Sequence, residues 1–192
     1  MKNIKFIIVF LFFTLIFQPT LRADDISEFE IEGMSIGDSL LDYFSKEEIK
    51  RKFKDGKKYK DSKFIRLFFK EQNFNNYEYL SITIKYNDQE FIIHGIAGMF
   101  DEKNHDRCLD KKSNIKKDIK SSFPNAKIRE WDKVSIQDKS GKSKIFGTSF
   151  DINSGTASVI CYLFTEEANI QSGLDVSIKS KEFNDFLRVR TK

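Results

Sequence analysis

Residues 79–100, YLSITIKYNDQEFIIHGIAGMF, carry the clearest fold signal in the chain. In residues 79–86, apolar side chains alternate with Ser, Thr and Lys, which is the period of a strand with one face in a core. Asn87 and Asp88 favour a tight turn, and residues 91–100 form a second, largely apolar run. The stretch therefore predicts an antiparallel hairpin. Its polar face is predicted to carry Ser81, Thr83 and Lys85.

Further strands are expected before and after this hairpin, since runs rich in aromatic and β-branched residues lie between turn residues. Two longer helices are expected after it. Apolar residues at helical spacing predict a helix over residues 106–123, with Pro124 just past its end, and a last helix after Ser180. The other predicted strands are residues 64–69, 131–137, 144–152, 157–164 and 174–178, with a weak edge strand at 26–31.

A pair of short helices is predicted between the first strands. Ser35, followed three residues later by Asp38, resembles a capping box, and Ser45 with Glu48 repeats the pattern. Gly56 is then a natural C-terminal residue for the second helix.

Together these elements predict the α+β class. We expect an antiparallel sheet of about six to seven strands with helices packed on one face, and the short helix pair at the mature N-terminus. No Pro-, Ser- or Gly-rich linker divides residues 24–192, which favours a single α+β domain. Helices on one face would leave the other face of the sheet free.

Residues 1–23 are typical of a secretory signal peptide. Lys2 and Lys5 precede the apolar residues 6–17, and Ala23 is a small residue at the expected cut. The apolar run would span about 18 Å as a helix, well short of a bilayer core of roughly 30 Å. No cysteine lies near the cut, so a lipid anchor is not expected there. We therefore expect a periplasmic mature chain without a stable membrane span.

The charge of the mature chain argues against a nucleic-acid-binding protein. The whole chain has 33 Lys and Arg against 29 Asp and Glu. The predicted signal peptide removes Lys2, Lys5 and Arg22, which leaves 30 against 29. Residues 46–70 hold eleven bases and four acids, after a stretch without bases. Such a run is usually a solvated face, and contact with anionic lipid is the weaker alternative.

The chain has two cysteines, Cys108 and Cys161. In an exported protein they are expected to pair. Cys108 lies on the apolar stripe of the predicted helix and Cys161 lies in a predicted strand, so both face a helix–sheet interface. A reactive thiol is the less favoured alternative, because the chain has no CxxC motif. We predict a structural disulfide.

The remaining motifs give no positive evidence for a cofactor, a metal or a catalytic group. His105 with Asp101 and Asp106 could form part of a metal site, but three or four ligands at a recognised spacing are absent from the sequence. Residues 141–143, GKS, match the end of a phosphate-binding loop. The glycine required five positions earlier is Ile136 here, so we interpret the segment as a hairpin turn.

Residues 31–44, IEGMSIGDSLLDYF, directly follow the predicted start of the mature chain. This segment resembles the mature start of small uncharacterised exported proteins of marine alphaproteobacteria. The resemblance covers about 14 residues and, more loosely, the layout of the whole chain. It implies a periplasmic location and no particular activity.

Two classes of function stay open. The first is a non-enzymatic binding or interaction protein of the cell envelope, whose partner is an unknown envelope protein or a small ligand. The second is an envelope hydrolase with carboxylates that the sequence does not identify. A pocket with a few convergent polar groups would favour ligand binding, and buried acids with shifted pKa values would favour the enzyme. A flat exposed apolar patch would favour a protein partner.

Overall fold

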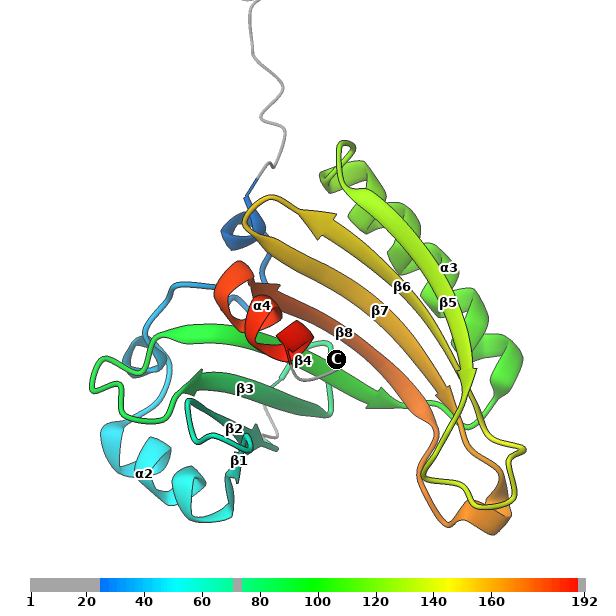
Figure 1. Cartoon of the computed structure of the whole chain (residues 1–192), viewed down its shortest axis with the longest axis horizontal. Coiled ribbons are helices and arrows are strands. Elements are labelled where there is room, and N and C mark those ends of the chain that lie inside the picture. The colour runs from blue at the N-terminus through cyan, green and yellow to red at the C-terminus, as the bar shows by residue number, and fades with distance from the viewer. Residues whose placement is uncertain (1–24, 71–73, 190–192) are drawn as a thin grey trace, which may run out of the picture.

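The computed structural model describes residues 25–70 and 74–189, so the predicted signal peptide lies outside the described residues. One curved antiparallel sheet of eight strands runs through the molecule in the order β1-β2-β3-β4-β8-β7-β6-β5 (Figure 1). The α+β class is confirmed. No helix in the described ranges is long and apolar enough to cross a membrane.

Most strand and helix bounds follow the predicted pattern; one exception is the strand predicted at residues 131–137, which begins at Lys127 and ends at Val134. The helices are α2 (Lys46–Asp55), α3 (His105–Ser122) and α4 (Lys181–Val189). Single 3-10 turns occur at Ile26–Glu28, Leu40–Asp42 and Glu166–Ala168. The strands are β1 (Lys57–Lys58), β2 (Phe64–Phe69), β3 (Tyr79–Lys85), β4 (Ile93–Asp101), β5 (Lys127–Val134), β6 (Lys144–Ile152), β7 (Gly155–Leu163) and β8 (Gly173–Ser180). The sheet has eight strands and not six to seven, because β1 is a two-residue strand too short to show a period.

The two faces of the sheet differ in chemistry. Along β8, Leu174, Val176 and Ile178 are buried on the face that we call the core face, which α2 and α3 cover. Alternate residues of each strand point to the opposite face, which we call the groove face. On β8 these residues are Asp175, Ser177 and Lys179.

The predicted helix pair is confirmed in its second member. The Ser45 hydroxyl accepts a hydrogen bond from the Glu48 amide at 3.3 Å, and α2 ends before Gly56. The first member is one 3-10 turn, Leu40–Asp42, capped by Ser39 and not by Ser35. Here the backbone N–H of Ser35 donates to the Asp38 carboxylate at 2.8 Å, which closes a turn instead of starting a helix.

The weak edge strand predicted at residues 26–31 is wrong. Ile26 begins a 3-10 turn, and Ile31 forms only an isolated bridge with Met34. Both isoleucines are buried in the core, about 1% exposed. Their burial, and not pairing with a neighbouring strand, determines the backbone path here.

The expectation that the helices share one face is wrong for α4. This helix follows β8 directly and packs on the groove face, opposite α3 (Figure 1). Its Phe183 ring lies 5.0 Å from that of Phe64 on β2, and Phe186 lies 4.9 Å from the same ring. Phe64 is a large apolar residue on the groove face, and α4 covers it and removes it from water.

Gly155 opens β7 where the chain passes very close to β8. A Cβ at this position would lie 2.1 Å from the carbonyl oxygen of Lys179 and 3.0 Å from Ile26 Cγ2. We expect Gly155→Ala to lower the free energy of unfolding by about 1–3 kcal/mol, because the two strands must move apart. Urea denaturation measures this loss. An unchanged midpoint and slope would show that the strands separate there without cost.

Candidate functional site

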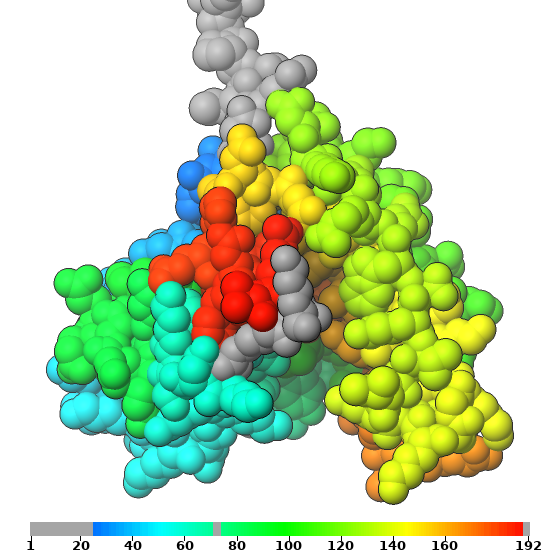
Figure 2. All heavy atoms as spheres, viewed as in Figure 1, coloured from blue at the N-terminus to red at the C-terminus, as the bar shows by residue number. Residues whose placement is uncertain are grey.

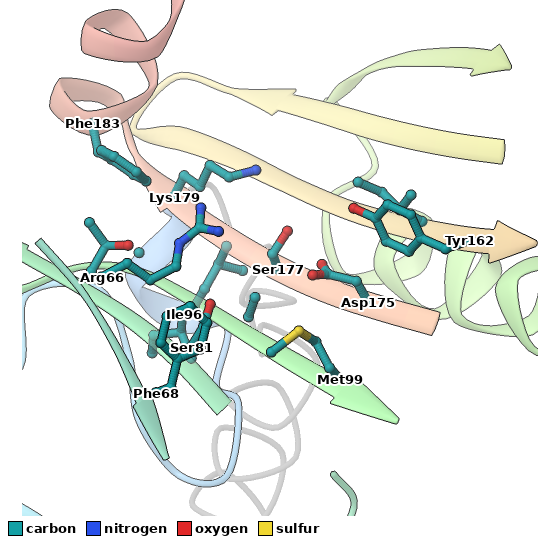
Figure 3. Close-up of a pocket in the computed structure, with 15 residues that line it drawn as sticks. Arg66, Phe68, Ser81, Ile96, Met99, Tyr162, Asp175, Ser177, Lys179 and Phe183 are labelled. Atoms are coloured by element: carbon teal, nitrogen blue, oxygen red, sulfur yellow. The ribbon is translucent and has the colours of Figure 1, made fainter. Parts of the chain in front are cut away.

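A cavity of about 140 Å³ opens on the groove face, between strands β2, β3, β4, β8 and β7 and the start of α4. Figure 2 shows this side of the molecule, with a hollow between the half that contains β1 to β3 and the half that contains β5. Figure 3 shows side chains from β2, β3, β4, β7 and β8 directed toward the same space. Charged and hydroxyl-bearing residues make up much of this lining.

Strand register brings the hydroxyl groups together. Ser81 and Thr83 of β3 point to the groove face, as predicted, and line the cavity. Ser177 of β8 is 4% exposed and its hydroxyl lies 2.9 Å from that of Ser158 on β7. These small polar side chains give the cavity a floor that can exchange hydrogen bonds with a ligand.

Asp175 is the most unusual residue of the site. Its side chain as a whole is partly buried, but its Oδ1 atom is enclosed and accepts no hydrogen bond from any described residue. Burial raises the pKa of this carboxyl. The rise is opposed by the positive charges of Lys179 and Arg66 and by a hydrogen bond from Ser177. A buried polar atom without a partner is costly, and such atoms are rare in native proteins.

Two cations share the cavity with Asp175. Burial lowers the pKa of the Lys179 ammonium, and the Asp175 carboxylate opposes this effect. Arg66 of β2 lines the same space and donates a hydrogen bond to the Tyr59 hydroxyl at 2.6 Å. Figure 3 shows the Arg66 guanidinium directed toward Lys179, with Asp175 farther along β8.

Aromatic side chains contribute to the walls. Phe68 of β2, which is 37% exposed, and Phe183 of α4 both line the cavity. Tyr162 of β7 stacks parallel to Phe164, with ring centroids 6.4 Å apart. Burial raises the pKa of Tyr162, and the nearby Asp175 raises it further, so the phenol keeps its proton and can donate.

Ion pairs hold α4 over one end of the groove. Glu182 lies 3.0 Å from the Lys63 ammonium and 2.9 Å from that of Lys85. Lys85 was predicted to belong to the polar surface with Ser81 and Thr83. It lies on the same face, but it pairs with α4 and is not among the residues that line the cavity.

The predicted cysteine pair is brought together. The sulfur atoms of Cys108 on α3 and Cys161 on β7 lie at disulfide distance, with their Cα atoms 6.0 Å apart. Both residues are fully buried on the core face, on the side of the sheet away from the cavity.

The other motifs take structural positions. His105 begins α3, and within the described ranges no group of three or more His, Cys, Asp and Glu side chains is arranged to hold a metal ion. The segment that contains the GKS sequence connects β5 and β6, as the hairpin interpretation predicts. There Asp138 accepts hydrogen bonds from the hydroxyls and amides of Ser140 and Ser143, which lower the pKa of its carboxyl.

Several lysines of the basic stretch 46–70 lie over aromatic rings. Lys58 is 3.9 Å from the centre of the Tyr86 ring, and Lys52 is 5.2 Å from that of Phe69. Part of this charge is thus held against the protein's own surface by cation–π contacts.

Asp175 and Lys179 were not predicted as site residues. The predicted strand ended at Ile178, so Lys179 fell outside it. The usable signal was their spacing: in a strand, residues four apart share a face, and here Asp175, Ser177 and Lys179 alternate with apolar residues. Arg66 carries the same signal within residues 64–69.

No protein-family model, curated protein or solved structure matches this chain. The function must therefore be argued from the site.

Proposed function

We propose that the chain is an exported, soluble periplasmic protein of the cell envelope that binds a small ligand in the groove without transforming it. The pattern of residues 1–23 supports export, and the resemblance of residues 31–44 to exported proteins supports the same location. One observation carries the binding role: the enclosed Oδ1 of Asp175, in a polar cavity, has no donor from the described residues.

The energetics of this atom favour a ligand. A buried acceptor without a partner costs about 1–3 kcal/mol, so a folded protein rarely keeps one without a reason. A ligand that supplies an N–H or O–H group removes this cost on binding. The hydroxyls of Ser81, Thr83 and Ser177 surround the same space and add orienting contacts.

An envelope hydrolase is the second candidate, and the raised pKa of Asp175 is the observation that favours it. A buried carboxyl that keeps its proton can act as a general acid. Hydrolysis by a carboxylate pair requires a second acid, and Asp175 is the one acid among the described residues that line the cavity. We therefore rank binding first.

Native mass spectrometry of the protein isolated from a periplasmic fraction tests this proposal. We expect extra mass in the native spectrum that disappears on denaturation. The variant Asp175→Asn should lose this mass, and Asp132→Asn, an exposed position on β5, should keep it. A bare chain with both residues intact would contradict binding of a retained ligand. Release of a chemically altered ligand would favour the hydrolase.

A further inference from the structure

The three formal charges that the described residues contribute to the cavity are separated along the groove. Lys179 and Asp175 lie on the same face of β8 with Ser177 between them. Arg66 enters from β2 and is directed toward Lys179, whereas Asp175 lies farther toward Tyr162 (Figure 3). The groove therefore has a positive end beside α4 and a negative end away from it.

A ligand must satisfy both ends. The enclosed Oδ1 of Asp175 needs a hydrogen-bond donor, and a cationic donor forms the stronger bond to a carboxylate. Lys179 and Arg66 carry donors only, so they need an acceptor, preferably an anionic one. A plain anion would leave Oδ1 without a partner, and a plain amine would face two cations without a counter-ion.

The size of the cavity limits the ligand further. An engineered cavity of about 150 Å³ in another protein holds benzene, a ligand of about six non-hydrogen atoms. The cavity of about 140 Å³ described above is of the same order. Its lining combines charged and hydroxyl groups with apolar side chains, where that engineered cavity is apolar, so it suits a compact molecule that carries polar groups.

Together, charge and size point to one class. We propose that the groove binds a small α-amino acid, with its ammonium on Asp175 and its carboxylate between Lys179 and Arg66. The hydroxyls of Ser177 and Ser81 lie beside this path. This assignment rests on the proposed function, because it names the ligand class of the same groove.

Isothermal titration calorimetry at neutral pH with matched probes tests the assignment. Alanine carries both charges, propionate lacks the ammonium, alaninamide lacks the carboxylate, and glycerol is neutral. We expect glycine, alanine or serine to bind, and propionate, alaninamide and glycerol to bind about tenfold more weakly or not at all. This comparison uses the unmodified protein, so it does not depend on the folding of a variant.

Two variants test the same assignment from the side of the protein. Asp175→Asn and Lys179→Met should each weaken binding of the amino acid by about tenfold or more. Asp132→Asn and Lys127→Met make the same changes at exposed positions on β5 and should leave it unchanged.

The outcomes separate the ligand class from the binding role. If propionate or alaninamide binds as well as alanine, the zwitterion is wrong. Tighter binding of phosphoethanolamine than of alanine would assign the groove to a lipid headgroup instead. If the amino acids fail while a retained mass is lost from Asp175→Asn, the class is wrong and the binding function stands. If the probes fail and no mass is retained, both proposals fall.

Discussion

Replacing Cys108 and Cys161 together by alanine is expected to lower the free energy of unfolding by about 4 kcal/mol. The two residues are 53 positions apart in sequence, and a cross-link over a loop of this length lowers the entropy of the unfolded chain and so raises its free energy. Alanine is the better replacement, since both positions are fully buried and a serine hydroxyl would need a partner.

Urea denaturation with and without dithiothreitol measures this effect. The wild-type protein should lose about the same stability in reductant as the double variant loses without it, and the double variant should not respond to reductant. Intact mass after alkylation gives an independent count of free thiols. If two thiols are labelled when the unreduced protein is denatured and alkylated, the predicted disulfide is wrong, and the pair is a contact between buried thiols.

The hairpin of β3 and β4 and the strand β2 show why much of the fold was predictable. Residues 64–69 were predicted as a strand with the bounds that the structure has. The alternation of apolar and polar side chains in residues 79–86 is likewise a local signal. It predicts the strand correctly because one face of the strand packs against the core. The caps at Ser45 and Gly56 are local in the same sense.

The failures share a different origin. The position of α4 depends on Phe64, which lies more than a hundred residues earlier and needs a cover on the groove face. Likewise, no period marks Ile26, which is buried beside the turn at Gly155. These contacts join distant segments, so a reading of one window of sequence at a time does not reveal them.

The residues of the site can also be separated into those that local sequence predicts and those that depend on distant contacts. Ser81 and Thr83 were predicted on a polar face, because alternation within β3 shows that face directly. Asp175, Lys179 and Arg66 come together only through the strand order, which places β8 beside β4 and β2 two strands further. The spacing within each strand marks these residues as charged positions on one face, but a single sequence contains no signal for the strand order, so their meeting in one site was not predictable.

Replacing Asp175 by Asn and Lys179 by Met in one variant is expected to raise the free energy of unfolding by about 1–4 kcal/mol and to abolish ligand binding. Burial shifts the pKa of each group toward its neutral form, upward for Asp175 and downward for Lys179. For each group the cost of burying the charge therefore exceeds what its partners return at neutral pH. Removing both charges relieves this cost at both positions, so neither charge is left buried in the absence of the other.

The pH dependence of this difference has a definite sign. The raised pKa of Asp175 means that its contribution to stability is present below the ordinary aspartate pKa of 3.8 and is lost as pH rises through the folded value. The lowered pKa of Lys179 means that its contribution is present above 10.5 and is lost as pH falls. Neutral pH is therefore where the wild-type pair costs most. The advantage of the double variant in urea denaturation should be largest there and should shrink on acidification toward 3.8.

A gain in stability together with a loss of binding would separate a functional pair from a structural one. Proteins keep destabilising groups where activity needs them, and stabilising replacements at such positions usually reduce function. The double control Asp132→Asn with Lys127→Met changes the same charges at exposed positions, so its stability should stay within about 0.5 kcal/mol of the wild type. If the double variant at 175 and 179 is less stable than the wild type, the pair holds the sheet together. That result would contradict the proposal that the protein keeps the two charged residues in order to bind a ligand.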